Sequence, residues 1–336
     1  MSPVLAPRPL FRPTGFPVAG VGVHRSGWPY AVEALEPWMS PDAPVLLDDN
    51  VERTFFLGTD GKRGIVHRTP WIGICHHPVS APRRVTIGLD RLDEFPAWRE
   101  SLPHLKLLIV MAPHAAPKLS RLWGVPCLAL HHPTEAPALS WSPQAFERNP
   151  AKKLVQVGHY LRNPDGIAQV AAPAWLEKAR LQTADPWAER SAQRWRLLYA
   201  HRPKVGAVTE MAHIEAEAYD VLLSENLVFM ELIRAMANNT VVECIARSTP
   251  VVLNRLRGPE WYLGPDYPLF YEDIGEVEGL LTRERILEAH HYLRQLPKDW
   301  LSGEAFARAL AEGCLRLVPE LWGKAAPKPL VRACDG

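Results

Sequence analysis

The stretch Asn238-Asn239-Thr240-Val-Val-Glu243-Cys-Ile-Ala-Arg-Ser-Thr249-Pro250-Val-Val, residues 238–252, predicts a short helix that runs directly into a strand. Asn or Thr before Val-Val-Glu is typical of a helix N-cap, and Glu243 follows Thr240 by three positions, as in a capping box. A helix N-terminus with free backbone N–H groups is a ready site for a diphosphate. Two adjacent asparagine amides need more partners than one cap supplies. We therefore favour a ligand site here over a Glu243 that only caps its own helix.

Apolar runs with the length of buried strands recur on both sides of this stretch, separated by helical patterns. Short continuous apolar runs joined by helices predict a buried parallel sheet. In the first half, the expected strands are Val18–Val23, Val45–Leu47, Trp71–Cys75, Leu105–Met111 and Val125–Leu130. In the second half, they are Lys153–Val157, Val205–Thr209, Leu227–Leu232 and Pro250–Asn254. Expected helices include Ala116–Trp123, Pro173–Ala184, Pro186–Ala200, Thr240–Arg247, Arg283–Gln295 and Gly303–Leu317.

The second half thus restarts the alternation of the first, which predicts an α/β chain of two successive doubly wound domains. The 336 residues agree, because a single hydrophobic core seldom grows so large. The proline-rich stretch 134–150 shows little periodicity and suits an inter-domain connection. We place an N-terminal domain at 1–140, a linker at 141–152, a C-terminal domain at 153–300, and a C-terminal helix and tail at 301–336.

Composition excludes several classes of protein. Lys and Arg number 38 against 37 Asp and Glu, a net charge of +1, so no nucleic-acid partner is expected. The five cysteines form no CxxC pair, which argues against a disulfide framework or a thiolate zinc site. No apolar stretch approaches the length that spans a membrane, and the first residues lack a secretory signal. We expect a cytoplasmic protein; the sequence does not indicate its oligomeric state.

Polar residues follow the expected strands, and in open parallel sheets ligands bind beyond the carboxyl ends of the strands. The first half offers three such sites, each a basic pair: His24-Arg25, His76-His77 and His131-His132. In the second half, comparable positions after strands or in loops are held by Gly158, Arg162, Asn163, Ser224, Glu225, Asn226 and Asn254. If the two halves face each other across a cleft, these residues line it. For His131 and His132, which sit at the domain linker, we favour a packing role.

The order of these motifs resembles that of GT-B glycosyltransferases. In the donor half of that family, a small-residue loop leads into a helix whose Glu binds the donor ribose, followed by a Thr-Pro-Val-Val strand. Three further stretches sharpen the match to a subset of bacterial and viral members: Lys153–Asn163, Tyr219–Phe229 and Glu260–Leu269. In that subset, His24–Trp28 opens the chain, and Trp71–Pro78 lies in the acceptor half. The resemblance spans residues 20 to 295.

The resemblance implies the GT-B fold, two Rossmann-like doubly wound domains facing across a cleft. It also implies transfer of a sugar from a nucleotide-activated donor to a glycan, a lipid-linked acceptor or another hydroxyl. Glu243 would bind the ribose, Asn239 and Thr240 the diphosphate, while Gly158 lets the backbone approach and Arg162 counters the charge. Asn163, Ser224, Glu225, Asn226 and Asn238 complete the expected donor site. Many retaining members carry an acid eight positions before the ribose Glu, where this chain has Ala235, so retention and inversion both stay open.

Sugar transfer requires a stabilised leaving group and, for inversion, a base that deprotonates the acceptor. A GT-B site can stabilise a diphosphate with a helix dipole and basic side chains, so we expect neither a metal nor a cofactor; the sequence holds no Asp-x-Asp. The candidate bases are His24, His76 and His77, because imidazole titrates near neutrality. Asp49 and its neighbour Asp48 compete for this role.

Three other functions remain open. A GT-B-like protein that binds a sugar or a partner without turnover would agree with Ala235. A metal-dependent hydrolase would use the His-His-Pro pairs, but adjacent histidines on an extended chain point to opposite faces. A sugar–phosphate epimerase shares the fold, and it would need several acid/base residues around one sugar, which the sequence does not reveal.

Overall fold

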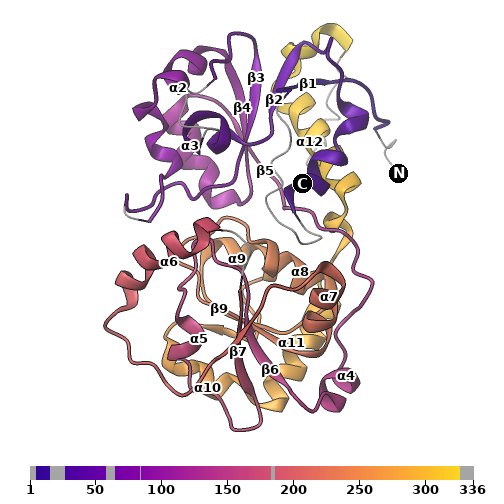
Figure 1. Cartoon of the computed structure of the whole chain (residues 1–336). Coiled ribbons are helices and arrows are strands. Elements are labelled where there is room, and N and C mark those ends of the chain that lie inside the picture. The colour runs from indigo at the N-terminus through magenta and orange to yellow at the C-terminus, as the bar shows by residue number, and fades with distance from the viewer. Residues whose placement is uncertain (1–4, 16–26, 58–64, 84, 183–185, 326–336) are drawn as a thin grey trace, which may run out of the picture.

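The chain folds into two α/β domains, each built on a parallel sheet (Figure 1). The structure, a computed structural model, describes residues 5–15, 27–57, 65–83, 85–182 and 186–325. The expected strand Val18–Val23 and the candidate base His24 lie outside the described residues.

The N-terminal domain holds a five-stranded sheet whose spatial order follows the chain. Its strands are β1 (Phe11–Pro13), β2 (Val45–Asp48), β3 (Trp71–Cys75), β4 (Leu105–Val110) and β5 (Cys127–Ala129), and every pair is parallel. All five residues of β3 are buried, as a central strand with helices on both faces requires. The predicted strands at Val45, Trp71, Leu105 and Val125 are therefore confirmed. The edge strand β1 is short and was not expected.

The C-terminal domain holds a six-stranded parallel sheet in the order β11-β10-β9-β6-β7-β8. Its strands are β6 (Lys153–Gln156), β7 (Glu177–Leu181), β8 (Thr209–Met211), β9 (Leu227–Met230), β10 (Val251–Asn254) and β11 (Phe270–Tyr271). The chain runs outward from β6 to β8, then returns to pair β9 with the other side of β6. The strand order therefore reverses between β6 and β9, and the crevice at such a switch point is where doubly wound sheets bind ligands.

Helices connect the strands and cover both sheets. In the N-terminal domain they are α1 (Trp28–Glu33), α2 (Pro96–Ser101) and α3 (Ala116–Trp123). In the C-terminal domain they are α4 (Pro143–Arg148), α5 (Gly166–Gln169), α6 (Pro186–Tyr199), α7 (Ala216–Glu225), α8 (Asn239–Arg247), α9 (Arg257–Leu263), α10 (Val277–Leu280) and α11 (Arg283–Gln295). The predicted helices at Ala116, Pro186, Thr240 and Arg283 are confirmed.

The last long helix, α12 (Gly303–Leu317), returns to the N-terminal domain and packs beside α1 (Figure 1). Phe306, Leu310 and Cys314 from this helix are buried in the same hydrophobic core as β2, β3 and β4. The N-terminal domain is therefore completed by residues from the far end of the chain.

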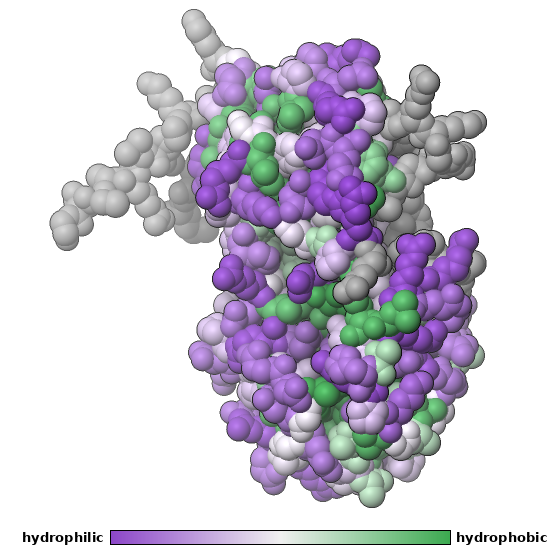
Figure 2. All heavy atoms as spheres, turned by 90° about the vertical axis from the view of Figure 1, so that its left-hand side faces the viewer, coloured by the Kyte–Doolittle hydropathy of each residue, from purple (hydrophilic) through white to green (hydrophobic). Residues whose placement is uncertain are grey.

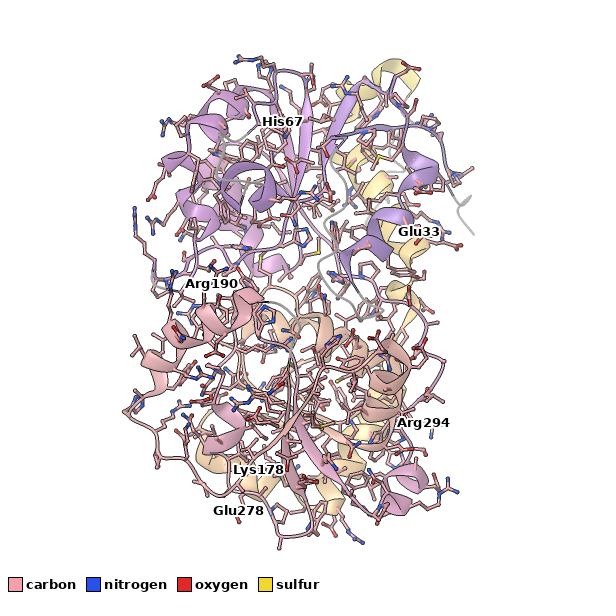
Figure 3. All side chains as sticks on the ribbon, in the orientation of Figure 1. Glu33, His67, Lys178, Arg190, Glu278 and Arg294 are labelled. Atoms are coloured by element: carbon pink, nitrogen blue, oxygen red, sulfur yellow. The ribbon has the colours of Figure 1, made fainter. Side chains whose placement is uncertain are left out.

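Two predicted elements are wrong. The strand expected at Val205–Thr209 shares only Thr209 with β8, which continues to Met211. The segment Pro173–Ala184 was expected to be helical, but it contains strand β7. Ala179 and Leu181 face the core, and Lys178, labelled in Figure 3, is buried because its ammonium donates to the carbonyls of Val170 and Val205. This tertiary pairing of a lysine, which no local pattern reveals, makes a buried strand possible here.

The two domains meet through a narrower middle, where hydrophobic atoms gather between more polar lobes (Figure 2). Within the described residues, no helix combines the length and apolarity needed to cross a bilayer.

Candidate functional site

The N-terminus of α8 is the centre of the candidate site, because it follows β9 at the switch point of the C-terminal sheet. Asn238 is its N-cap: the Asn238 Oδ1 accepts from the Val241 N–H at 3.3 Å. The same oxygen accepts from Arg162 Nη2 at 3.1 Å, and Thr240 Oγ1 accepts from Arg162 Nη2 at 3.1 Å. The predicted capping box is therefore wrong, since Asn238 rather than Thr240 caps the helix and Glu243 lies one turn further in.

Arg162 is a cation buried at this helix end. Only 6% of it is exposed, its Nη1 donates to the Val157 carbonyl, and its Nε has no partner within the described part of the chain. No described carboxylate forms an ion pair with it. Burial lowers the pKa of Arg162, and nearby groups that include Glu243 partly oppose this shift. An unpaired buried charge is costly, and the positive end of the helix dipole adds to it, so the cluster favours an anion.

Gly158 brings the backbone of the loop after β6 next to this guanidinium. Its φ is +69°, a conformation that favours glycine. A Cβ at this position would fall onto the guanidinium nitrogens of Arg162. Gly158 itself is exposed. The turn therefore places an accessible backbone segment directly over the buried cation.

Glu243 lies below the cluster in the first turns of α8 and is almost fully buried. Its Oε2 accepts from the Tyr219 hydroxyl of α7 at 2.7 Å. Burial is the main cause that raises the pKa of Tyr219 well above its usual value, so this hydroxyl stays protonated and donates. Tyr219 begins the stretch Tyr219–Phe229, and its place before β9 was the only signal in the sequence that could have found it.

Two other expected donor residues lie near the cluster. Asn239 is exposed at the first position of α8. Asn163 lies in the loop after β6, but its amide is buried and donates to Glu231 Oε2 at 2.7 Å and to Gln169 Oε1 at 3.0 Å. Asn163 therefore supports the loop from within instead of presenting its side chain.

Three expected donor residues lie at the opposite edge of the sheet. Ser224 and Glu225 end α7, and Asn226 immediately precedes β9. The Asn226 Oδ1 accepts from the backbone N–H of Lys153, the first residue of β6, at 2.8 Å. These residues thus sit at the amino ends of the strands, whereas Arg162 lies beyond the carboxyl ends. The expectation that Ser224, Glu225 and Asn226 join the donor site is therefore wrong, because this polar run precedes β9 and does not follow a strand.

In the N-terminal domain, His76 follows β3 and is half-buried. Its Nε2 lies 3.0 Å from the Asp49 carbonyl, and its ring packs edge-on against Trp28 with centroids 4.4 Å apart. A carbonyl only accepts, so the neutral imidazole carries its proton on Nε2 and leaves Nδ1 as an acceptor. No described residue hydrogen-bonds that Nδ1. His76 therefore has the geometry of a base with a fixed tautomer.

His77 has a different role from the one expected. It is only 6% exposed, its Nδ1 donates to the Ile87 carbonyl at 3.2 Å, and its Nε2 accepts from the Tyr160 hydroxyl at 2.8 Å. Burial lowers the pKa of His77 to about 4. Because both ring nitrogens are engaged and the ring stays neutral near pH 7, the structure leaves His77 no free position for a substrate proton.

The two aspartates after β2 are also engaged. Asp49 pairs with Arg53 at 2.6 Å and accepts from Trp28 Nε1 at 3.2 Å. Asp48 is fully buried and its Oδ2 lies 2.8 Å from Nε2 of His67, the residue that Figure 3 labels in the upper domain. Both carboxylates are therefore engaged in ordering the loop after β2. His76 is for this reason a better candidate for the base than Asp48 or Asp49.

The His77–Tyr160 contact joins the two halves of the site. Tyr160 lies two residues after Gly158, and its hydroxyl also lies 3.2 Å from Thr86 Oγ1. A second link runs from Trp195 Nε1 of α6 to the Val85 carbonyl at 3.2 Å. The loop after β3, which carries His76, thus touches the loop after β6, which carries Gly158 and Arg162.

His131 and His132 pack at the boundary of the domains. The His131 ring is stacked between Trp261, at 3.9 Å, and Trp300, at 4.4 Å. The backbone N–H of His132 donates to the Tyr262 hydroxyl at 2.9 Å. Burial lowers the pKa of each imidazole to about 4. Among the residues whose positions are described, no group of three or more His, Cys, Asp or Glu is placed to hold a metal ion.

Two α/β domains with parallel sheets that face each other, with a polar site at the carboxyl ends of both sheets, match the GT-B fold; among the described strands, only the C-terminal sheet shows the reversed order of a doubly wound domain. Structural neighbours share it. Sucrose-phosphate synthase from Thermosynechococcus elongatus is 17% identical, with a TM-score of 0.53 over 82% of this chain and 73% of that one. An Escherichia coli trehalose-6-phosphate structure bound with UDP-2-fluoro glucose is 12% identical, with a TM-score of 0.55 over 86% and 77%.

Anabaena HepE in complex with UDP and glucose is also similar, at 12% identity and a TM-score of 0.52 over 73% of this chain and 71% of that one. At these identities the likeness establishes the GT-B fold alone. No protein-family model and no curated protein sequence matches the chain.

Proposed function

We propose that the chain is a glycosyltransferase that moves a sugar from a nucleotide-activated donor to a hydroxyl group of an acceptor. The observation that carries this proposal is the buried Arg162 guanidinium, which has no paired carboxylate among the described residues and lies against the N-terminus of α8 beneath Gly158. Two independent sources of positive charge meet an accessible backbone turn there. A diphosphate satisfies all three.

In this proposal, Gly158, Arg162, Asn239 and Thr240 bind the diphosphate, and Glu243 binds the ribose with the carboxylate that Tyr219 orients. Two neighbours of the same fold were solved with UDP or a UDP-sugar, so uridine diphosphate sugars are the first donors to test. The acceptor is a glycan, a lipid-linked molecule or another hydroxyl compound.

The proposed reaction uses His76 as the base. The acceptor hydroxyl gives its proton to His76 Nδ1 while its oxygen forms a bond to the anomeric carbon. The bond between that carbon and the diphosphate oxygen breaks, and the nucleoside diphosphate leaves with the electron pair. Arg162 and the helix dipole stabilise the charge on this leaving group. The site itself supplies this positive charge, so the proposed reaction needs neither a metal nor a cofactor.

The test is turnover of a panel of UDP-, GDP-, TDP-, ADP- and CMP-sugars, followed as release of free nucleotide. We expect one donor to be consumed, and His76→Gln to lower the rate about 10²- to 10⁴-fold, the usual contribution of a general base. Nucleotide affinity should stay unchanged in this variant. The matched control is His104→Gln, since His104 precedes β4 at the opposite edge of the same sheet.

If no donor is consumed while a nucleotide still binds, the chain is a GT-B-like binding protein without turnover. If His76→Gln retains full activity, the assignment of the base is wrong.

A further inference from the structure

Glu52 is a fully buried carboxyl group in the helical segment that follows β2, and the proposed reaction does not use it. Its Oε1 accepts two backbone hydrogen bonds, from the N–H of His76 and from the N–H of His77, each 2.7 Å long. One carboxyl oxygen therefore holds both peptide groups at the point where β3 ends. Strands β2 and β3 are neighbours in the sheet, so the contact joins the carboxyl ends of adjacent strands.

The other oxygen of the same group is unusual. Glu52 Oε2 is buried and has no hydrogen-bond partner within the described residues. Burial raises the pKa of Glu52, and the main opposing influence is the nearby His76. Leaving a buried polar atom unpaired destabilises a fold. The stability of the fold therefore does not by itself explain a carboxyl group at this position.

The segment after β2 contacts His76 at two separate points. Glu52 fixes its backbone N–H, while the carbonyl of Asp49, three residues earlier, fixes its ring through Nε2 at 3.0 Å. Trp28, which is itself tied to Asp49 through its indole N–H, packs against the ring. With the backbone and Nε2 both held, χ1 and χ2 of His76 have little freedom, and the position of Nδ1 is set.

We propose that Glu52 is a positioning residue that holds the His76 backbone so that the imidazole stays in the Nε2–H form with Nδ1 free to accept a proton. Its importance for sugar transfer rests on the proposed function; its effect on the His76 ring does not. The competing explanation is that Glu52 only stabilises the turn between β3 and the following loop. In variants that fold but lose the contact, the positioning role predicts a change in the tautomer of the His76 ring, and the competing explanation predicts none.

Three substitutions separate them. Glu52→Gln keeps a carbonyl oxygen for both backbone N–H groups and replaces only the oxygen that has no described partner. Glu52→Asp keeps a carboxyl group but withdraws it by one methylene from the His76 and His77 amides. Glu52→Ala removes the acceptor altogether. The control is Glu231→Ala, which removes a similarly buried carboxylate from the C-terminal domain, where it accepts from Asn163 and Arg202.

The measurement is long-range ¹H–¹⁵N NMR of the imidazoles in the full chain, with His76→Gln to assign the His76 signals. In the wild type and in Glu52→Gln, His76 should show the Nε2–H pattern alone. In Glu52→Asp and Glu52→Ala, it should show averaged nitrogen shifts from a mixture of tautomers. The Glu231→Ala variant should keep the wild-type nitrogen shifts of His76 even if its melting temperature is lower. Should Glu52→Ala fail to fold, the comparison of Glu52→Asp with Glu52→Gln decides.

With a donor that is turned over, Glu52→Asp should lower kcat about 10- to 100-fold, the effect of a small displacement of a catalytic group, at unchanged donor affinity. Glu52→Gln should restore the rate to within about threefold. The proposal is overturned if Glu52→Asp and Glu52→Ala fold and keep the single His76 tautomer. If the tautomer changes but no nucleotide sugar is bound or consumed, the positioning role stands and the proposed function fails.

Discussion

At the scale of single residues, Arg162 is held between the loop after β6 and the start of α8. The guanidinium donates to the Val157 carbonyl on one side and to Asn238 and Thr240 on the other. These contacts satisfy several of its N–H groups without neutralising its charge, because none of these acceptors is ionised. The positive charge therefore remains available to an anion that approaches over Gly158.

Replacing Gly158 with alanine should disrupt this arrangement in two ways. The residue has φ of +69°, which penalises any side chain, and the added Cβ collides with the Arg162 guanidinium. We expect Gly158→Ala to weaken nucleotide diphosphate binding more than tenfold, measured by calorimetric titration, and to lower the melting temperature.

The control is Gly124→Ala, whose φ of +70° gives the same backbone penalty but whose Cβ meets nothing within 4 Å. It should lower stability by about 1 kcal/mol and leave nucleotide binding unchanged. Equal affinity in the two variants would show that the loop over Arg162 is not a binding element.

Sequence alone predicted part of the site. Gly158, Arg162, Thr240 and Glu243 could be placed by their positions after strands or near a helix start, and the structure brings Arg162 against Thr240. Tyr219 and Glu52 could not be predicted as partners, because their contacts join residues 24 positions apart in both cases. Ser224, Glu225 and Asn226 were misplaced since a polar run between a helix and a strand looks the same at either edge of a sheet.

At the scale of elements, the strands that were predicted best are those buried on both faces. The runs at Trp71–Cys75 and Leu105–Val110 are apolar throughout and lie in the middle of the first sheet. β7 was mistaken for a helix because Glu177, Lys178 and Arg180 interrupt its apolar pattern. Those charges are accommodated by distant partners: Lys178 by two carbonyls, and Arg180 by Asp165 and Glu210.

The helix α12 shows a second limit of local patterns. Its amphipathic sequence predicts a helix, and α12 matches the expected bounds of Gly303–Leu317. Its burial against β-strands more than 150 residues earlier depends on tertiary contacts. Gly313 of α12 also depends on a tertiary contact, because a Cβ at this position would meet the side chain of Leu128 in β5. A local pattern thus indicates that a helix forms but does not say which core the helix joins.

At the scale of the whole molecule, three neutral histidines lie at the boundary between the two domains. His77 Nε2 accepts from the Tyr160 hydroxyl across the boundary, the His131 ring stacks between Trp261 and Trp300, and the backbone N–H of His132 donates to Tyr262. Each has a pKa of about 4 because of burial, below the ordinary value of 6.5. We therefore expect protonation of these rings in acid to weaken the boundary between the domains.

These histidines should make stability depend on pH between 6.5 and 4. In that window the unfolded chain binds protons at these rings and the folded chain does not, so the free energy of unfolding is highest above pH 6.5 and falls on acidification. We expect His77→Gln to reduce the slope of melting temperature against pH in this window. His201→Gln, at an exposed residue beyond α6, should keep the wild-type slope. An unchanged slope in His77→Gln would mean that His77 is not buried in its neutral form.

A donor site at the N-terminus of α8 is tested by calorimetric titration of the chain with UDP, GDP, TDP and ADP. Each is compared with its nucleoside, for the wild type and for Arg162→Gln. We expect that one diphosphate binds, that its nucleoside binds at least tenfold more weakly, and that Arg162→Gln abolishes the difference between them. A diphosphate that binds Arg162→Gln as tightly as the wild type, or the failure of every diphosphate to bind, would contradict a donor site at the N-terminus of α8.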